Sequence, residues 1–410
     1  MPKERRTLST ADAAQLSAAM FTSFGPESFG VELEWPVHAQ DDMAIRPSAQ
    51  DIAMLAATKL PARGRLTFEP GGQVELSTAP ARSAVDALRA ADIDTQALTT
   101  HLQRAGFSLE AIALDTRRTP RRTLQRPRYQ AMEHFFAQQG PAGAWMMCNS
   151  ASTQVNIGLG SSDPYQRWHT LHLISPVLIA AFANSPGIDA SGQKWASLRQ
   201  GVWWAIDPTR TRPVRTDLAP EVAWLQYSLA ANVMFIRTAR NTGEGVTVCK
   251  PGFSFARWMT EGHATGWPTV EDYRYHLTTL FPPIRPRCWL ELRVLDALPS
   301  WIRDVAVLSV ATACTGEASR ELHERLPDTR NLWITAAREG LDHPILDKAA
   351  RILSEVVSEH LGTVSTDSHH ADIVEEYAAR FVNRGCSPGA DTAIRSQSLA
   401  QRHAPDLTRL

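Results

Sequence analysis

Four segments of the sequence alternate, residue by residue, between apolar side chains and acids or amides. They are Gly30–Trp35, Gln73–Ser77, Thr153–Ile157 and Trp289–Val294. Successive side chains of a β-strand point to opposite faces of a sheet, so each segment predicts a strand with one apolar face and one polar face. The most common structure with this pattern is an antiparallel sheet that has one face on a core and the other in water.

The polar face of these strands has an unusual composition for a surface in water. Such a surface commonly mixes lysine, threonine, arginine and glutamate, whereas here lysine is absent and glutamate recurs. The side chains on this face are Glu32, Glu34, Gln73, Glu75, Ser77, Gln154, Asn156, Glu291 and Arg293. If the strands lie side by side, the carboxylates repel one another unless cations lie between them. Mg²⁺ prefers oxygen ligands, usually a few carboxylates with waters and substrate phosphates. The pattern therefore predicts a site for two or more Mg²⁺ that hold the phosphates of ATP.

Other nucleotide-binding motifs are absent from the sequence. It contains no GxxxxGK[ST] loop, no GxGxxG after a predicted strand and no set of kinase motifs. If ATP binds, metal ions and arginines must hold its phosphates. The 42 lysines and arginines nearly balance the 43 aspartates and glutamates, which gives no reason to expect nucleic acid or a membrane surface as a partner.

The cysteines and apolar runs indicate the compartment. Five scattered cysteines without a CxxC pair fit a reducing environment better than a disulfide framework. No apolar run has the length of a bilayer span, and no signal-type apolar stretch follows the basic start. These features predict a cytoplasmic protein.

The rest of the chain predicts a mixture of helices, strands and one arginine-rich loop. Pro70, Gly71 and Gly72 supply the turn of a hairpin. Residues 1–390 are expected to form a single catalytic domain, helical from about residue 299, and residues 391–410 a poorly ordered tail. The other predicted elements are helices at 84–104 and 163–183, a loop at 116–128, and a pair of strands at 144–148 and 152–158.

Several blocks of the sequence resemble the plant-type glutamate–cysteine ligases. The resemblance rests on their order and spacing from about residue 25 to 315, and within the family it is greatest to the actinobacterial branch tied to ergothioneine synthesis. The blocks are Gly30–Trp35, Phe68–Pro80, Pro127–Tyr129, Ser152–Asn156, Asn184–Pro186, His276–Pro282 and Trp289–Arg293, with single residues such as Arg199 and Asp296 between and after them.

The resemblance implies a fold. Members of the family have an α+β fold in which a six-stranded, mostly antiparallel sheet bends into a bowl and is surrounded by helices. This core is related to the catalytic domain of glutamine synthetases.

The resemblance also implies roles for individual residues. The metal ligands would be Glu32, Glu34, Glu75, Gln154 and Glu291. Arg293 would contact phosphate or the developing acyl phosphate and, with Glu291, is assigned to catalysis. Arg199 would bind the α-carboxylate of glutamate. Arg128, Tyr129 and Asn156 would line the substrate side, with Tyr129 in the cysteine pocket. Glu69 is left open between a further metal ligand and a turn carboxylate, and the arginines of the 116–128 loop between an anion-binding patch and a solvated basic loop.

The implied reaction joins the γ-carboxylate of glutamate to the amine of cysteine, with ATP as co-substrate and Mg²⁺ as cofactor. It proceeds through γ-glutamyl phosphate and needs no protein nucleophile. A monomer or weak homodimer is expected, with no nucleic-acid or membrane partner. Two alternatives remain open: a ligase of the same fold that uses a different amine, and a non-catalytic homologue that binds glutamate or nucleotide.

Overall fold

Six strands form one antiparallel sheet in the order β11-β12-β6-β1-β4-β3. The structure, a computed structural model, describes residues 6–22, 27–160, 163, 165–237, 245–391 and 402–408. All four alternating segments predicted as strands lie in this sheet, which confirms the predicted fold class. The strands are β1 (Phe29–Trp35), β3 (Arg65–Phe68), β4 (Val74–Ser77), β6 (Ser152–Ile157), β11 (Ile284–Pro286) and β12 (Leu290–Asp296).

Two local features set the register of the sheet. Between β3 and β4 the chain turns at Gly72, whose φ of 88° suits glycine and whose N–H donates to the carbonyl of Glu69 at 2.9 Å. In β12 a bulge between Leu292 and Leu295 adds one residue relative to β6. Because of this extra residue, Glu291 pairs with Asn156 and Asp296 with Ser152, so both acids of β12 stand on the polar face.

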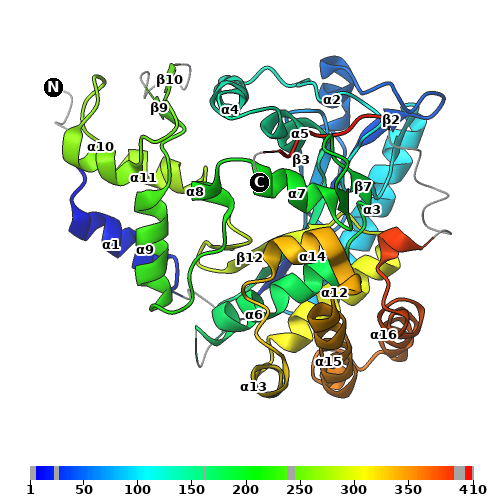
Figure 1. Cartoon of the computed structure of the whole chain (residues 1–410). Helices are drawn as coiled ribbons and strands as arrows, with labels where there is room; N and C mark the ends of the chain where they lie inside the picture. The colour runs from blue at the N-terminus through cyan, green and yellow to red at the C-terminus, as the bar shows by residue number, and fades with distance from the viewer. Residues whose placement is uncertain are drawn as a thin grey trace.

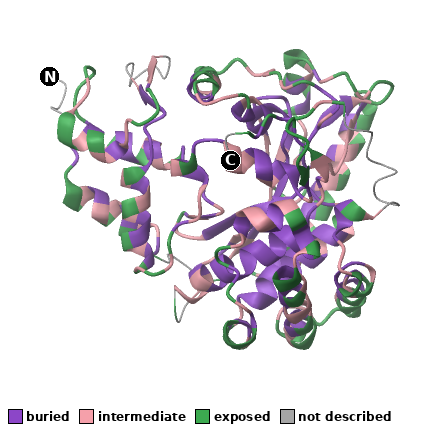
Figure 2. Cartoon of the chain, in the orientation of Figure 1, coloured by how far each residue is buried: buried purple, intermediate pink, exposed green. Residues whose placement is uncertain are grey.

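The apolar face of the sheet packs against three helices, α3 (Ala84–Arg104), α6 (Gln166–Ala181) and α12 (Ser300–Ala313). Side chains of these helices and of the strands, among them Val31, Leu33 and Val155, form one large hydrophobic core. Figure 2 shows α6 and α12 as buried over most of their length, and both are nearly devoid of charged residues along that stretch. Pro176 lies inside α6.

The polar face is bordered by a different group of helices, which carry the substrate-side residues. They are α4 (Pro127–Ala137), α5 (Ala142–Asn149) and α7 (Leu198–Ala205). A second, smaller core joins α1 (Thr10–Ala19), α9 (Pro220–Ala230), α10 (Phe255–Glu261) and α11 (Val270–Leu277), which group together on the left of Figure 1.

The remaining elements are short strand pairs and the helices not yet described. The pairs are β2 (Val37–Ala39) with β5 (Phe107–Leu109), β7 (Gly187–Ile188) with β8 (Lys194–Trp195), and β9 (Phe235–Arg237) with β10 (Val246–Val248). The helices are α2 (Ala49–Leu55), α8 (Pro208–Thr211), α13 (Gly316–Arg325), α14 (Trp333–Glu339), α15 (Pro344–His360) and α16 (Ser368–Arg380), with 3₁₀ turns at Gly340–Asp342, Leu361–Thr363, Val382–Arg384 and Pro388–Ala390. None of the helices in the described part of the chain is long and apolar enough to cross a membrane.

One strand prediction is wrong. Residues 144–148 belong to helix α5, in which all residues except Ala144 are buried. A short apolar run without alternation fits a buried strand and a buried helix equally well, so periodicity alone could not separate them.

The end of the chain also differs from the expected poorly ordered tail. Residues 392–401, 409 and 410 lie outside the described residues, but 402–408 pack on the protein. Leu407 is buried in the main core, beside Gly201 of α7. The backbone N–H groups of Arg402 and His403 donate to the carbonyl of Thr116. The single-domain organisation of 1–390 stays a prediction.

Candidate active site

The register of the sheet brings the predicted polar residues together on one face. Glu32 of β1 lies opposite Gln154 of β6, and Glu34 lies opposite Glu75 of β4. A pocket of about 360 Å³ opens over this face. Of the predicted residues, it is lined by Glu32, Glu34, Glu75, Arg128, Tyr129, Gln154 and Arg293; it is also lined by Arg65, Glu69, Arg285 and Arg287.

The carboxylates on β1 and β4 are held by uncharged donors. Glu34 accepts hydrogen bonds from the Ser152 hydroxyl and from Nε2 of Gln154, each at 2.9 Å. Glu32 accepts from Nδ2 of Asn156 at 3.0 Å, and Glu75 from the Thr67 hydroxyl at 2.6 Å. No direct ion pair to these three glutamates occurs among the described residues. Their charges are therefore oriented but not neutralised.

Two of these acids, Glu32 and Glu34, bind a proton more tightly than a free carboxyl group does. Burial, followed by repulsion from Glu291 and Glu75, raises the pKa of Glu32 to about 7. Burial and the charge of Glu75 also raise the pKa of Glu34. The same two causes raise the pKa of Glu69 to about 8. A half-buried cluster of acids without protein cations is the donor set that hard divalent cations such as Mg²⁺ favour, so the residues present fit such ions. Glu69, left open above, belongs to this cluster by position.

Glu291, at the other end of the face, has the opposite environment. Its side chain is fully buried and its two oxygens accept hydrogen bonds from Nη2 of Arg285 at 2.7 and 2.9 Å. Arg293 forms a second close ion pair with it, and Nη1 of Arg287 lies 3.4 Å away. Burial alone would raise the pKa of Glu291, but the three arginines together hold it at about 2. Glu291 does not line the pocket directly, and its predicted role as a metal ligand stays a prediction.

Gln154 and Asn156 connect the two ends. Gln154 donates to Glu34 through Nε2 and accepts from Nη1 of Arg293 at 2.7 Å through Oε1. Asn156 donates to Glu32 and accepts from the indole N–H of Trp289 at 2.9 Å. Each amide thus orients one carboxylate of the cluster. A metal-ligand role of Gln154 and a substrate-binding role of Asn156 stay predictions.

Arg128 and Tyr129, at the start of α4, line the pocket as predicted. Arg128 donates to the carbonyl of Thr278 at 3.0 Å and lies over the ring of Tyr275 at 5.1 Å. The Tyr129 hydroxyl donates to the carbonyl of Phe68 at 3.4 Å. Burial raises the pKa of Tyr129, so its hydroxyl stays protonated at neutral pH.

Arg199, like Glu291 and Asn156, does not line the main pocket. It is 2% exposed and lines a separate cavity of about 20 Å³. Its Nη1 lies 3.7 Å from Asp296, which accepts hydrogen bonds from the hydroxyls of Ser185 and Ser197.

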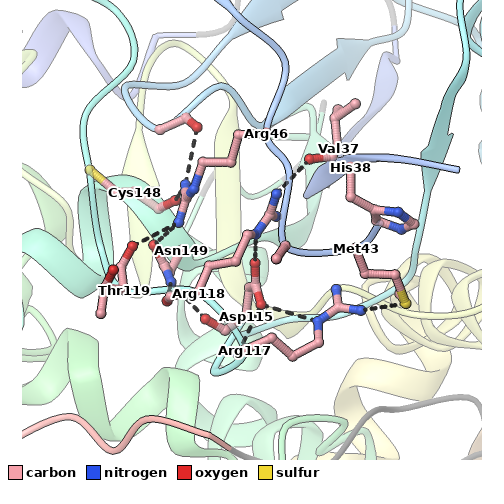
Figure 3. A network of polar contacts seen from close by, with 12 residues as sticks. Val37, His38, Met43, Arg46, Asp115, Arg117, Arg118, Thr119, Cys148 and Asn149 are labelled. Carbon is pink, nitrogen blue, oxygen red and sulfur yellow. Dashed lines mark hydrogen bonds and ion pairs between the residues drawn. The ribbon is translucent and has the colours of Figure 1, made fainter. Parts of the chain in front are cut away.

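The arginine-rich loop is neither an anion patch nor a solvated basic loop at Arg117 and Arg118. Both are buried and form ion pairs with Asp115 (Figure 3). In the same network, Arg46 donates to the carbonyls of Gly71, Cys148 and Thr119. The Gly71 turn, which leads into Glu75, is thereby fixed to the end of α5. These arginines support the backbone next to the site.

The sequence analysis missed Arg285, Arg287 and Arg65. The first two flank a proline in Ile284-Arg285-Pro286-Arg287, directly before the strong β12 pattern. Alternation within Ile284–Pro286 was the available signal, but a strand of three residues is too short to recognise by period.

Comparisons with known proteins show which family the chain belongs to. The family described as glutamate–cysteine ligase family 2 (GCS2) matches residues 28–396. The chain is 36% identical to glutamate–cysteine ligase EgtA of Mycolicibacterium smegmatis over 342 residues, which cover 80% of this chain and 79% of the relative. It is 34% identical to glutamate–cysteine ligase EgtA of Mycobacterium tuberculosis over 385 residues, covering 89% and 88%.

A solved structure shares the fold. A bifunctional glutathione synthetase from Pasteurella multocida superposes with a TM-score of 0.54 and 14% identity, over 98% of this chain and 53% of that chain. At this identity the similarity concerns the fold alone. The family match and the two bacterial relatives confirm the predicted resemblance: this chain belongs to glutamate–cysteine ligase family 2.

Proposed function

We propose that the protein is a glutamate–cysteine ligase that uses ATP and Mg²⁺ to form γ-glutamylcysteine. Its family is one of ATP-dependent ligases. The observation that carries the proposal is the divided polar face: acids without protein cations lie beside a group of arginines in one pocket. A carboxylate and a triphosphate repel each other, so a site that joins them needs cations from both sources.

The chain's own residues would hold the metal ions, contact the transferring phosphoryl group and fix the positions of the reactants. Glu32, Glu34, Glu75 and Glu69 would hold Mg²⁺, which when bound neutralises the phosphates of ATP. Arg293 lies on the pocket wall, held by Gln154 and Glu291, where its guanidinium can contact the transferring phosphoryl oxygens. The fixed positions of both reactants supply much of the remaining acceleration.

The two steps follow from these positions. The γ-carboxylate of glutamate attacks the γ-phosphorus of ATP, forming γ-glutamyl phosphate and releasing ADP. The amine of cysteine then attacks the acyl carbon, and phosphate leaves. Tyr129 and Arg128, which also line the pocket, would contact the amine substrate and its carboxylate. No cysteine of the protein is required.

The test is an ADP-release assay with glutamate, Mg²⁺, ATP and a panel of amines that contains cysteine, serine, glycine and 2-aminobutyrate. We expect cysteine to give the highest kcat/KM. A clear preference for another amine would identify the alternative carboxylate–amine ligase. Glutamate binding with no turnover on any amine would identify a non-catalytic homologue. A coupled assay with a second ligase would not be needed, because ADP reports the first step directly.

The pathway is a further proposal. The similarity to two EgtA proteins favours ergothioneine synthesis as the use of the product. Deletion of the gene in its host, followed by thiol analysis, would test this. Loss of ergothioneine that added γ-glutamylcysteine restores is the expected result, and unchanged ergothioneine would contradict it.

A further inference from the structure

Trp203 of α7 stands between two cavities. The main pocket of about 360 Å³ and the small cavity of about 20 Å³ share Trp203, Phe281 and Arg293 as lining residues. Arg199 lines only the small cavity. The indole ring therefore belongs to the wall that separates Arg199 from the site where glutamate must react.

Polar atoms at this wall lack hydrogen-bond partners. In Arg199, Nε and Nη1 are buried without a hydrogen-bond partner, although Nη1 lies 3.7 Å from Asp296; Nη2 donates to the carbonyl of Arg293 at 3.3 Å. In Trp203 the indole Nε1 is also buried without a partner. Leaving a buried donor unpaired costs free energy, and each of these groups is complementary to an anion.

The small cavity cannot accommodate a substrate carboxylate in this structure. A cavity of about 20 Å³ has room for about one water, not for a carboxylate with the carbon chain attached to it. The Trp203 ring is held by an edge-on contact with Phe281, with ring centroids 5.8 Å apart, and by the guanidinium of Arg293 at 5.6 Å. These contacts are weaker and less directional than a hydrogen bond at the indole N–H would be.

We propose that Trp203 is a gate to the glutamate subsite. The α-carboxylate of glutamate reaches Arg199 when the indole ring turns away from Phe281, and the indole N–H then donates to the same carboxylate. The small cavity and the main pocket become continuous in that state. This inference rests on the proposed function, because it takes Arg199 as the residue that binds glutamate.

The adjacent Trp204 provides a matched control. It lines the small cavity as well, but its ring stacks with the guanidinium of Arg212 at 3.8 Å and also lines an outer cavity of about 560 Å³. Trp333 lines both the small cavity and the outer one. If glutamate entered from the outside, Trp204 and not Trp203 would respond to it.

The experiment uses the full chain labelled with 5-fluorotryptophan and observed by fluorine NMR. The resonances of the two tryptophans are assigned with Trp203→Phe and Trp204→Phe. Glutamate is titrated, and calorimetry measures its binding on the same sample. We expect the Trp203 resonance to shift in step with the calorimetric curve and by more than the Trp204 resonance. An unchanged Trp203 resonance at saturating glutamate, or a shift of Trp204 alone, would overturn the proposal.

Kinetics give a second measurement. Trp203→Phe keeps an aromatic ring but removes the N–H, so we expect the KM for glutamate to rise about tenfold with little change in kcat or in the KM for ATP. Trp204→Phe should raise the KM for glutamate less than Trp203→Phe does. Equal effects of the two substitutions would show a general packing role and contradict the gate.

The Arg199→Lys variant distinguishes a failure of the proposed role of Arg199 from a failure of the gate. If this variant binds glutamate as tightly as the wild type, the proposed role of Arg199 fails. If it binds glutamate more weakly and the wild-type Trp203 resonance still does not respond to glutamate, the gate alone fails and the proposed function stands.

Discussion

The glutamates at the two ends of the polar sheet face have opposite electrostatic environments. At the β11–β12 end, three arginines surround Glu291 and lower its pKa to about 2. At the β1–β4 end, neutral hydroxyls and amides orient the glutamates, and the pKa of Glu32 rises to about 7. The comparison teaches where the chain supplies its own cations and where it leaves the charge for ions from solution. The first arrangement neutralises its charge within the folded protein, and the second is the proposed binding site for metal ions.

The largest effect is expected from Glu291→Gln, which breaks the internally neutralised end. Removing one partner of a buried ion pair typically costs about 3–5 kcal/mol, since the arginines are left buried without a counter-charge. Both the unfolding midpoint in urea and the rate of ADP release should fall. As a control, Glu261→Gln removes the partner of Arg257 in a solvent-exposed pair, where the cost should stay within about 1 kcal/mol. Equal effects of the two substitutions would remove the distinction.

Glu32→Gln tests the other end, and its effect should be on activity rather than stability. A metal ion contributes several kcal/mol of charge stabilisation, so losing a ligand should slow ADP release by about 100-fold or more. In EDTA the variant should be at least as stable as the wild type, because one of the repelling carboxylates is gone. The exposed Glu317→Gln, with the same charge change, serves as the control. Full activity of Glu32→Gln would contradict the metal cluster.

The smallest effect concerns pH, measured on the metal-free protein in EDTA. The folded-state pKa values of Glu32 and Glu69 lie above the ordinary 4.5, so their stabilising contribution is complete below that value. It is lost as the pH rises through about 7 to 8. Glu291 behaves oppositely: its contribution is present above 4.5 and is lost as the pH falls toward about 2.

Between pH 5 and 8, the free energy of unfolding in EDTA should therefore decline by about 1 kcal/mol or more through the acidic end alone. Adding Mg²⁺ at pH 8 should restore it, and Glu32→Gln should flatten the decline. Urea unfolding at a series of pH values measures all three. A curve that is the same with EDTA and with Mg²⁺ would show that the cluster does not bind the ion.

Much of the acidic end could be predicted from the sequence, because period-two alternation places Glu32, Glu34 and Glu75 on one face without further information. The pairing of β1 with β4 then depended on the β3–β4 hairpin and on the apolar faces that both strands turn to the core. The arginine end could not be predicted in the same way. Its main partner, Arg285, lies on a strand of three residues, and the bulge that places Asp296 depends on how β12 pairs with β6.

The position of Arg199 relative to the main pocket could not be predicted from the sequence. The family resemblance identified the residue, but not that Trp203 separates it from the main pocket, since that depends on how α7 packs against Phe281. For Ala144–Cys148 the local pattern was ambiguous, and burial on almost all sides selected the helix.

The packing of residues 402–408 has a consequence for the order in which the protein is built. Leu407 lies against Gly201, two positions after Arg199, and Pro405 accepts a hydrogen bond from Ala190. During synthesis on the ribosome, the sheet and its acids can assemble long before these residues exist. The helix that carries Arg199 and Trp203 gains its last packing contact only when Leu407 has emerged. A nascent chain can thus have the acidic face of its sheet in place while the helix that carries Arg199 is still incompletely packed.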